Sequence, residues 1–397
     1  MRETAPPPSC PGMTLDHVGI ALASPEHEAL FARLLGASPY KHETVEREGV
    51  RTVFFGDGGT PGAAPKLELL EATRDDSPVA SFVTKRGGGV HHLAFEVADI
   101  EAEMARVRAL GVRLLADDPR PGADGKRIVF LHPKDTAGVL VELVETVPPP
   151  VERTHVPFGD GRLGVRISGA ADRPALVALH GALGTADQLA PLLDAWSRTF
   201  RVIAPDLPGH GSSTLPEAVP SWDLYADAVE AVIGEFGIDR AHLFGYSLGA
   251  GVALKLAHRR PGVVHRLALH ATNVQWRARE VDQMTAEVMS AVNSPKQADR
   301  LGALHSEGWP EAVDAMLAFS RGLPEAWIDD TALASIEAPA LVSIGDRDAL
   351  FAPEAALHLA QTLPNARLWV LPDVAHSLST LDLPAFAKAV ATHLAPT

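Results

Sequence analysis

Cysteine is almost absent from this chain of 397 residues, which limits the chemistry open to the protein. The one cysteine, Cys10, lies close to the N-terminus. An internal disulfide is therefore excluded, and so is a metal cluster held by several thiolates. If the protein binds a metal ion, histidine and carboxylate side chains must supply the ligands.

Long apolar runs and a basic leader are also missing. No run approaches the roughly 18 apolar residues that a bilayer-spanning helix needs, so no membrane association is expected. The first twelve residues, MRETAPPPSCPG, contain neither a basic segment nor an apolar core. This argues against a secretory signal and favours a cytoplasmic protein. The prolines predict a disordered tail over residues 1–13.

The third absence is an excess of basic residues. Lys and Arg number 35 against 50 Asp and Glu, for a formal net charge of −15. Because nucleic-acid binding depends on basic patches that neutralise phosphates, no nucleic-acid partner is expected. The partners expected are small-molecule substrates.

A run of three prolines at positions 148–150 divides the chain, since proline cannot extend the strand-like run before it. We place a linker at residues 147–155. The length of the chain is also too great for one ordinary core. Residues 14–146 read as short alternating strands separated by two helices. Residues 156–397 read as apolar strands alternating with helices, as in a parallel α/β sheet.

The first half contains an internal repeat. LDHVGIALASPEHEALFARLLG and VHHLAFEVADIEAEMARVRALG each run from a histidine-bearing strand to a helix N-cap and then to a terminating glycine. The intervals between these positions are identical in the two copies, so the repeat predicts two similar modules. The matched positions are His17, Ser24 and Gly36 in the first copy and His92, Asp99 and Gly111 in the second.

Each copy also ends in a strand that carries a glutamate, Glu68 in KLELLEA and Glu142 in VLVELVE. A single such histidine or glutamate is usually a half-buried or solvated strand residue. Four matched positions instead favour two modules related by a local twofold axis, with His17, Glu68, His92 and Glu142 converging on one cleft. Imidazole and carboxylate ligands suit a divalent cation such as cobalt, manganese, zinc or nickel. Strand alternation predicts that His92 faces this site and that His91 points the other way.

The repeat resembles the vicinal oxygen chelate superfamily, whose fold pairs βαβββ modules. DHVGIAL, RDDSPVASFV, GGGVHHLAFEV and FLHPKDTAGVLVELVE are similar to the methylmalonyl-CoA epimerase family across residues 14–146. The resemblance implies one divalent metal on His17, Glu68, His92 and Glu142, with Glu142 as an acid/base that moves the proton next to the thioester. Some epimerases carry a further glutamate at the position of Thr52, so the second acid/base is left open, with Glu68 as a candidate.

The second half contains GYSLG at residues 245–249, a serine between glycines after the apolar strand AHLF. This pattern is typical of a strained strand-to-helix turn that exposes Ser247. The half resembles the α/β-hydrolase superfamily over residues 156–395, with a helical cap at about 271–335. The resemblance implies His376 as the base, Asp348 (or Asp346 in GDRD) as its acid, and the amides of Ala182 and Leu248 as the oxyanion hole. No cofactor is expected in this half.

The leading hypothesis is a bifunctional enzyme, a metal-dependent methylmalonyl-CoA epimerase fused to a serine hydrolase of an ester or thioester. A narrower version makes the hydrolase a thioesterase for a related acyl-CoA. In two alternatives the first half is another glyoxalase-type isomerase or lyase, or a ligand-binding module that leaves the hydrolase as the main activity. Because members of the first superfamily often dimerise, the resemblance also implies a homodimer.

Overall fold

The computed structural model describes residues 13–395 except 57–64, 148–149, 216, 218, 293–294, 306–307 and 327–328. The predicted N-terminal tail, apart from its last residue, lies outside the described residues. The chain divides into two compact units, Met1–Pro148 and Pro149–Thr397. The linker prediction of 147–155 is partly wrong, because residues 151–155 belong to a strand of the second unit. These residues pair with β10 (Gly161–Ser168), so the strand begins directly after the prolines and shortens the predicted linker.

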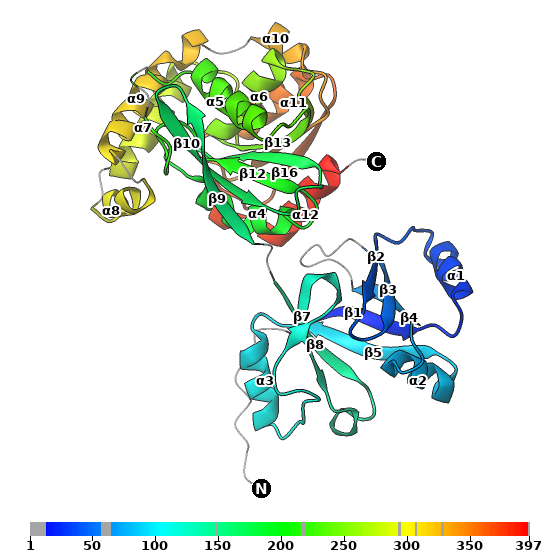
Figure 1. Ribbon diagram of the computed structural model, residues 1–397. Helices are drawn as coiled ribbons and strands as arrows, with labels where there is room; N and C mark the ends of the chain where they lie inside the picture. Colours follow the sequence, from blue (N-terminus) through cyan, green and yellow to red (C-terminus); the bar gives the residue numbers. More distant parts are fainter. Residues whose placement is uncertain are drawn as a thin grey trace. The chain divides into compact units, whose positions relative to one another are not determined.

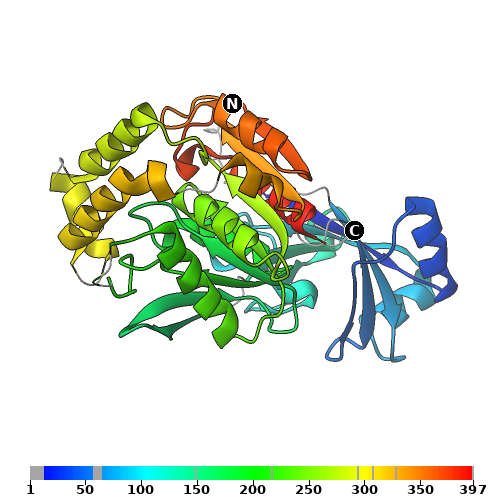
Figure 2. The ribbon, with the colours of Figure 1, turned by 90° about the horizontal axis from the view of Figure 1, so that it is seen from above.

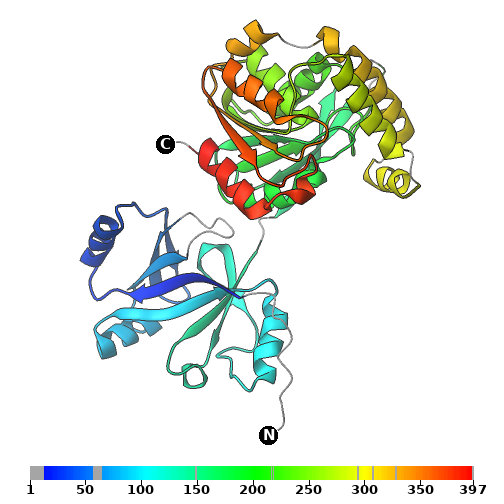
Figure 3. The same cartoon turned by 180° about the vertical axis from the view of Figure 1, so that it is seen from behind.

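The first unit is built on an eight-stranded sheet with the order β2-β3-β4-β1-β5-β8-β7-β6. Each half of this order is one module, and the first strands of the modules, β1 and β5, pair antiparallel at the centre (Figures 1 and 3). This confirms the predicted pair of βαβββ modules. The strands are β1 (Thr14–Ala21), β2 (Lys41–Val45), β3 (Val50–Phe55), β4 (Lys66–Ala72), β5 (Gly89–Glu96), β6 (Arg120–Pro121), β7 (Lys126–Leu131) and β8 (Val141–Thr146).

The two predicted helices are present as α1 (Glu26–Leu35) and α3 (Ile100–Ala109). Asp99 caps α3 by accepting a hydrogen bond from the amide of Ala102, as predicted. Ser24 is not the cap residue of α1: the N-cap is Pro25, without a side-chain hydrogen bond. A further helix, α2 (Pro78–Arg86), lies between the modules and was not predicted.

The second unit has a sheet with the order β16-β15-β14-β13-β11-β12-β10-β9, parallel from β12 to β16. In β11 the side chains of Leu176 and Val177 belong to different hydrophobic clusters, so both faces of the sheet are buried. This is the expected α/β-hydrolase arrangement. The strands are β9 (Val151–Phe158), β10 (Gly161–Ser168), β11 (Ala175–Leu179), β12 (Arg201–Pro205), β13 (Ala241–Tyr246), β14 (Val264–His270), β15 (Ala340–Gly345) and β16 (Ala366–Leu371).

Helices cover both faces of this sheet. Figure 1 shows α5, α6 and α11 on one face and α4 and α12 on the other, and Figure 3 shows the red α12 opposite the orange α11. The core helices are α4 (Ala190–Trp196), α5 (Trp222–Glu235), α6 (Leu248–Arg259), α11 (Pro353–Thr362) and α12 (Leu383–Leu394).

In the segment predicted as a cap, residues 271–335, most of the described residues are helical. Figure 2 shows α7, α8 and α9 gathered at one end of the second unit. The helices described in this segment are α7 (Ala278–Val292), α8 (Pro295–Leu304), α9 (Trp309–Ala326) and α10 (Asp330–Ala334). Among the described helices of the whole chain, none combines the length and the apolar character that crossing a membrane requires.

Candidate functional site

Four side chains of the first unit meet at the centre of its sheet. His17 lies on β1, Glu68 on β4, His92 on β5 and Glu142 on β8, which are the four adjacent central strands. All four are at most 5% exposed. The tertiary structure therefore brings together the four residues that the repeat singled out.

The donor atoms of these residues are at ligand spacing. His17 Nε2 lies 3.0 Å from His92 Nε2, 3.3 Å from Glu68 Oε2 and 3.4 Å from Glu142 Oε2. His92 Nε2 lies 3.3 Å from Glu68 and 3.4 Å from Glu142. Around a cation with bonds of about 2.1 Å, adjacent ligands lie roughly 3.0 Å apart in an octahedron and roughly 3.4 Å apart in a tetrahedron. The residues present fit a divalent cation, and donor atoms of His17, His92 and Glu142 all lie within 4.8 Å of one another.

The electrostatics of the centre also favour a cation. Burial alone would raise the pKa of Glu68, but hydrogen bonds from His17 and His92 outweigh it and hold this pKa at about 2. Burial alone would lower the pKa of His17, but the neighbouring carboxylates, first that of Asp16, raise it well above its ordinary value. The raised pKa of His17 reflects the carboxylates around it, and the lowered pKa of Glu68 keeps its carboxylate ionised.

Space for the ring of His92 comes from a glycine on the neighbouring strand. Gly19 on β1 pairs with His92 on β5. A Cβ at Gly19 would lie 2.3 Å from the ring of His92. Only glycine at this position leaves the imidazole free to reach the centre.

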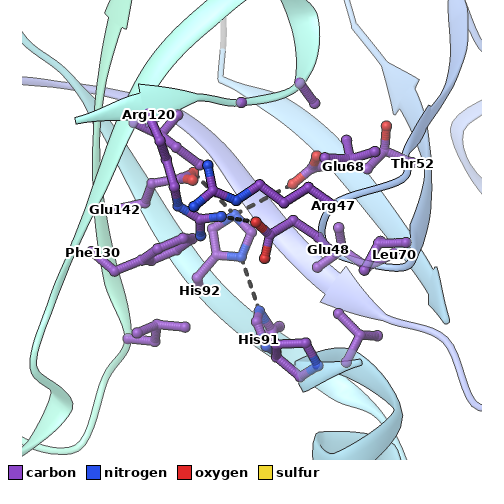
Figure 4. Close-up of a pocket in the computed structure, with 18 of the residues that line it drawn as sticks. Arg47, Glu48, Thr52, Glu68, Leu70, His91, His92, Arg120, Phe130 and Glu142 are labelled. Atoms are coloured by element: carbon purple, nitrogen blue, oxygen red, sulfur yellow. Dashed lines mark hydrogen bonds and ion pairs between the residues drawn. The ribbon is translucent and has the colours of Figure 1, made fainter. Parts of the chain in front are cut away.

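The prediction that His91 points away from the site is wrong. The pairing of β1 with β5 shifts register between Gly19, opposite His92, and Ile20, opposite Val90, so His91 is an extra residue in the strand. Its ring lines the same cavity as His92, and the two Nδ1 atoms lie 3.0 Å apart (Figure 4). Burial and the charge of His92 lower the pKa of His91 to about 4, which keeps this ring neutral near pH 7.

Asp16 is the counterpart of His91 in the first module, and its role was not predicted. Another register shift leaves Asp16 as the extra residue of β1. Its carboxylate lies 2.7 Å from His17 Nδ1 and also pairs with Lys126. Asp16 therefore orients His17 so that Nε2 faces the centre. Asp16 and His91 each precede a ligand histidine at the same position of the repeat, and this match could have indicated a role beside the site. Strand alternation alone instead assigned both residues to the far face of the sheet.

A cavity of about 430 Å³ opens onto the centre. Arg47, Glu48 and Arg120 line it together with His92, and Figure 4 shows them grouped around the ring. Arg120 forms an ion pair with Glu48. None of these three residues was singled out from the sequence, because charged side chains in a loop or at a strand end are usually solvated.

Thr52 lies where some epimerases carry a glutamate. It lines the same cavity, is 2% exposed, and its hydroxyl donates to the carbonyl of Glu43 at 3.3 Å. The neutral hydroxyl of Thr52 cannot replace a carboxylate as the base. Among the described residues that line the cavity, the carboxylates are those of Glu48, Glu68 and Glu142.

The second unit places Ser247 on a strained turn between β13 and α6. Its φ of 52° and ψ of −113° are rare for a residue with a side chain. A Cβ at Gly245 would lie 2.4 Å from Ala250, and one at Gly249 would lie 2.4 Å from the carbonyl of Leu179. The two glycines of the motif are therefore required by close backbone approach, as the sequence predicted.

Ser247, His376 and Asp348 form a hydrogen-bonded chain. His376 Nε2 lies 3.1 Å from Ser247 Oγ, and His376 Nδ1 lies 2.8 Å from Asp348 Oδ2. The side chain of Asp348 is fully buried, whereas that of Asp346 is partly exposed and lies 3.9 Å from Arg347. The structure therefore places Asp348, and not the alternative Asp346, on the histidine. Tyr246 donates to the carbonyl of His376 at 2.9 Å and supports that loop.

The predicted oxyanion amides lie next to the serine. Ala182 and Ser247 line one cavity of about 270 Å³, and Leu248 follows the serine at the start of α6. Within the described part of the chain, neither the amide of Ala182 nor that of Leu248 donates to another group. Two unengaged N–H groups beside a nucleophile are the arrangement that an oxyanion hole requires.

Comparison with known proteins assigns each unit separately. The sequence profile of the Glyoxalase/Bleomycin resistance protein/Dioxygenase superfamily matches residues 16–130, and that of the alpha/beta hydrolase fold matches residues 174–309. The first unit is 40% identical over 131 residues to the mitochondrial methylmalonyl-CoA epimerase of Homo sapiens, covering 32% of this chain and 72% of that protein. The second is 31% identical over 245 residues to the pimeloyl-[acyl-carrier protein] methyl ester esterase of Chromobacterium violaceum, covering 56% of this chain and 94% of that protein.

The chain thus belongs to the methylmalonyl-CoA epimerase and α/β-hydrolase families. A solved hydrolase from Pseudomonas aeruginosa PA01 superposes on the hydrolase unit with a TM-score of 0.53 at 24% identity. The match covers 62% of this chain and 99% of that structure, and it supports the α/β-hydrolase fold of the second unit. The two units are called the epimerase unit and the hydrolase unit below.

Replacing His91 of the epimerase unit by alanine should weaken metal binding without abolishing it. The substitution removes the group that holds His92 Nδ1, but it keeps all four donors of the centre. Loss of such an outer partner typically costs about 10- to 100-fold in metal affinity. Competition with a fluorescent chelator would measure this loss. His91→Gln, which can still accept a hydrogen bond, should recover part of the affinity, and an unchanged affinity in His91→Ala would contradict the assignment.

Proposed function

We propose that the epimerase unit inverts the α-carbon of a malonyl-type acyl-CoA, with methylmalonyl-CoA as the substrate, and that it depends on a divalent metal. The observation that carries the proposal is the convergence of two imidazole nitrogens and two carboxylate oxygens at 3.0–3.4 Å beside a cavity. The likeness to methylmalonyl-CoA epimerases supports it. His17, Glu68, His92 and Glu142 would hold cobalt, manganese, zinc or nickel.

The reaction needs a base that removes the α-proton and an acid that returns a proton on the other face. The bond that breaks is the α C–H bond, and its electron pair passes into the thioester to form an enolate. A bound divalent cation would supply the positive charge that the developing enolate oxygen needs. We assign the proton acceptor to Glu142, which lies on β8 and lines the cavity.

A second acid/base is needed on the opposite face of the α-carbon. Glu68 comes from β4 of the other module and reaches both histidines. Because Thr52 offers no carboxylate, we assign the second position to Glu68, whose module is related to that of Glu142 by the repeat.

We propose in addition that the hydrolase unit cleaves an ester or thioester through Ser247. His376 would accept the hydroxyl proton, Asp348 would orient the imidazole, and the amides of Ala182 and Leu248 would stabilise the oxyanion. The distances of 3.1 Å and 2.8 Å along the chain Ser247–His376–Asp348 carry this proposal. The esterase likeness supports an ester or thioester as the substrate class.

Proton exchange tests the epimerase proposal directly. The cobalt-loaded protein, incubated with methylmalonyl-CoA in deuterated water, should exchange the α-proton at least about a thousandfold faster than the same protein treated with chelator, because metal stabilisation of the enolate is worth several kcal/mol. Mass spectrometry measures the exchange. Restored exchange after metal is added back is the control. No exchange with metal present, or turnover of the methylglyoxal–glutathione adduct instead, would contradict the assignment.

A further inference from the structure

The cavity of the epimerase unit contains a basic pair that the proposed proton transfer does not use. Arg47 and Arg120 both line the cavity that His92 and Glu142 also line. Figure 4 shows the two guanidinium groups pointing toward one another in front of the imidazole of His92. Burial and, next, the charge of Arg47 lower the pKa of Arg120, as expected for two cations close together.

The carboxylate that forms an ion pair with Arg120 is that of Glu48. It lies in the turn between β2 and β3 of the first module, whereas Arg120 lies on β6 of the second module, so their ion pair joins the two modules across the cavity. Arg47 makes no ion pair with any residue in the described part of the chain. Glu48 therefore pairs with only one of the two cationic groups.

The charge balance leaves this region positive when a metal is bound. The carboxylates of Glu68 and Glu142 match the charge of one divalent cation. The basic pair with Glu48 then contributes one net positive charge, and a low-dielectric cavity strengthens its attraction for an anion. The ligand that fits is an anion small enough to share the cavity with a metal-bound group.

Arg120 is also held in position before any ligand arrives. Its backbone pairs with Ile128 of β7, and its guanidinium lies 5.8 Å from the ring centroid of Phe130. The planar fork of arginine matches a carboxylate with two parallel hydrogen bonds. Glu48 is the carboxylate that pairs with this fork in the absence of a ligand.

We propose that Arg120, assisted by Arg47, binds the free carboxylate of a malonyl-type acyl thioester, and that Glu48 is the resident counter-ion which this carboxylate displaces. The proposal rests on the proposed epimerase function and names the groups that select a charged acyl chain over a neutral one. Glu48 competes with the substrate carboxylate for Arg120 and is not an acid/base. Removing the charge of Glu48 should therefore strengthen substrate binding.

The test compares three α-methyl thioesters on the cobalt-loaded protein: methylmalonyl-CoA, its carboxyl methyl ester, and methylmalonyl N-acetylcysteamine, which lacks the phosphates of CoA. Arg120→Ala should raise KM roughly 10- to 100-fold for both acids and leave the methyl ester within about threefold, as expected for loss of hydrogen bonds to a charged group. Glu48→Gln should lower KM for both acids while kcat is kept. Arg127→Ala is the matched control, because Arg127 on β7 pairs with Glu101 and Glu145.

Three outcomes would overturn the proposal. Equal losses for acid and ester in Arg120→Ala would indicate a structural role, and a loss confined to the CoA substrates would indicate phosphate binding. A collapse of kcat in Glu48→Gln would make Glu48 an acid/base. Arg120→Lys, which keeps the charge but lacks the fork, carries the test if Arg120→Ala does not fold.

Calorimetry separates this proposal from the proposed function. Malonyl-CoA should bind the metal-loaded wild type more tightly than propionyl-CoA, and Arg120→Ala should remove the difference. If wild type binds malonyl-CoA selectively but exchanges no α-proton, the epimerase assignment fails and the carboxylate subsite stands. Equal binding of the two acyl-CoAs overturns the subsite.

Discussion

His92→Ala is expected to release the metal and to abolish α-proton exchange. His92 Nε2 is one of four donors at the centre and lies within 3.4 Å of the other three. Its removal deprives the metal of a ligand and leaves the negative charge of the two buried carboxylates less well balanced. A loss of roughly a thousandfold or more in exchange follows if several kcal/mol of enolate stabilisation depend on the metal. Metal analysis of the purified protein and deuterium exchange into methylmalonyl-CoA measure both effects.

The control for this variant is a histidine of the same unit outside the centre. His42 lies on β2, is half exposed, and pairs with Glu28 on the surface. His42→Ala should keep both metal and exchange. Probe labelling of Ser247 in His92→Ala would show that the hydrolase unit is still folded, since each unit has its own hydrophobic clusters. Full metal content and full exchange in His92→Ala would contradict the assigned centre.

Ser247→Ala is expected to abolish hydrolysis and labelling by a fluorophosphonate probe. The substitution removes the hydroxyl oxygen that lies 3.1 Å from His376 Nε2. Without a nucleophile, the remaining groups can only bind substrate and polarise it, so ester turnover should fall by at least about a thousandfold. Gel fluorescence with the probe and turnover of a short acyl ester measure the loss.

The stability of Ser247→Ala should change little, because alanine keeps the Cβ and meets the same backbone strain at φ 52°. Ser379→Ala is the matched control: Ser379 is exposed near His376 and should be dispensable. Exchange of methylmalonyl-CoA should be unchanged in Ser247→Ala. Labelling equal to wild type would remove Ser247 as the nucleophile.

Where in the sequence these sites lie could be read from spacing. The identical intervals in the two copies placed His17 and His92 on equivalent strands, and the glutamates near the ends of the copies followed. The flanking glycines of GYSLG predicted the crowded turn at Ser247, which the structure shows. Intervals of this kind survive folding because both copies obey the same local rules of helix capping and strand alternation.

Local rules failed where one strand carries an extra residue. Alternation placed His91 on the far face, but the register shift between β1 and β5 turns it toward the cavity. Nothing local marks such a bulge, because it depends on how two strands 75 residues apart pair. The same kind of shift makes Asp16 the outer partner of His17.

The sequence by itself determined the pair of βαβββ modules, the α/β-hydrolase class, and the strands and turns that carry His17, Glu68, His92, Glu142 and Ser247, because repeated spacing and turn chemistry are local properties. Only the tertiary structure decided which neighbours complete the sites. It selected Asp348 over Asp346, turned His91 and Asp16 toward the metal ligands, and set Arg120 of one module against Glu48 of the other. These contacts join residues that are distant in the chain, and their geometry is set by strand register and module packing rather than by the identity of sequence neighbours.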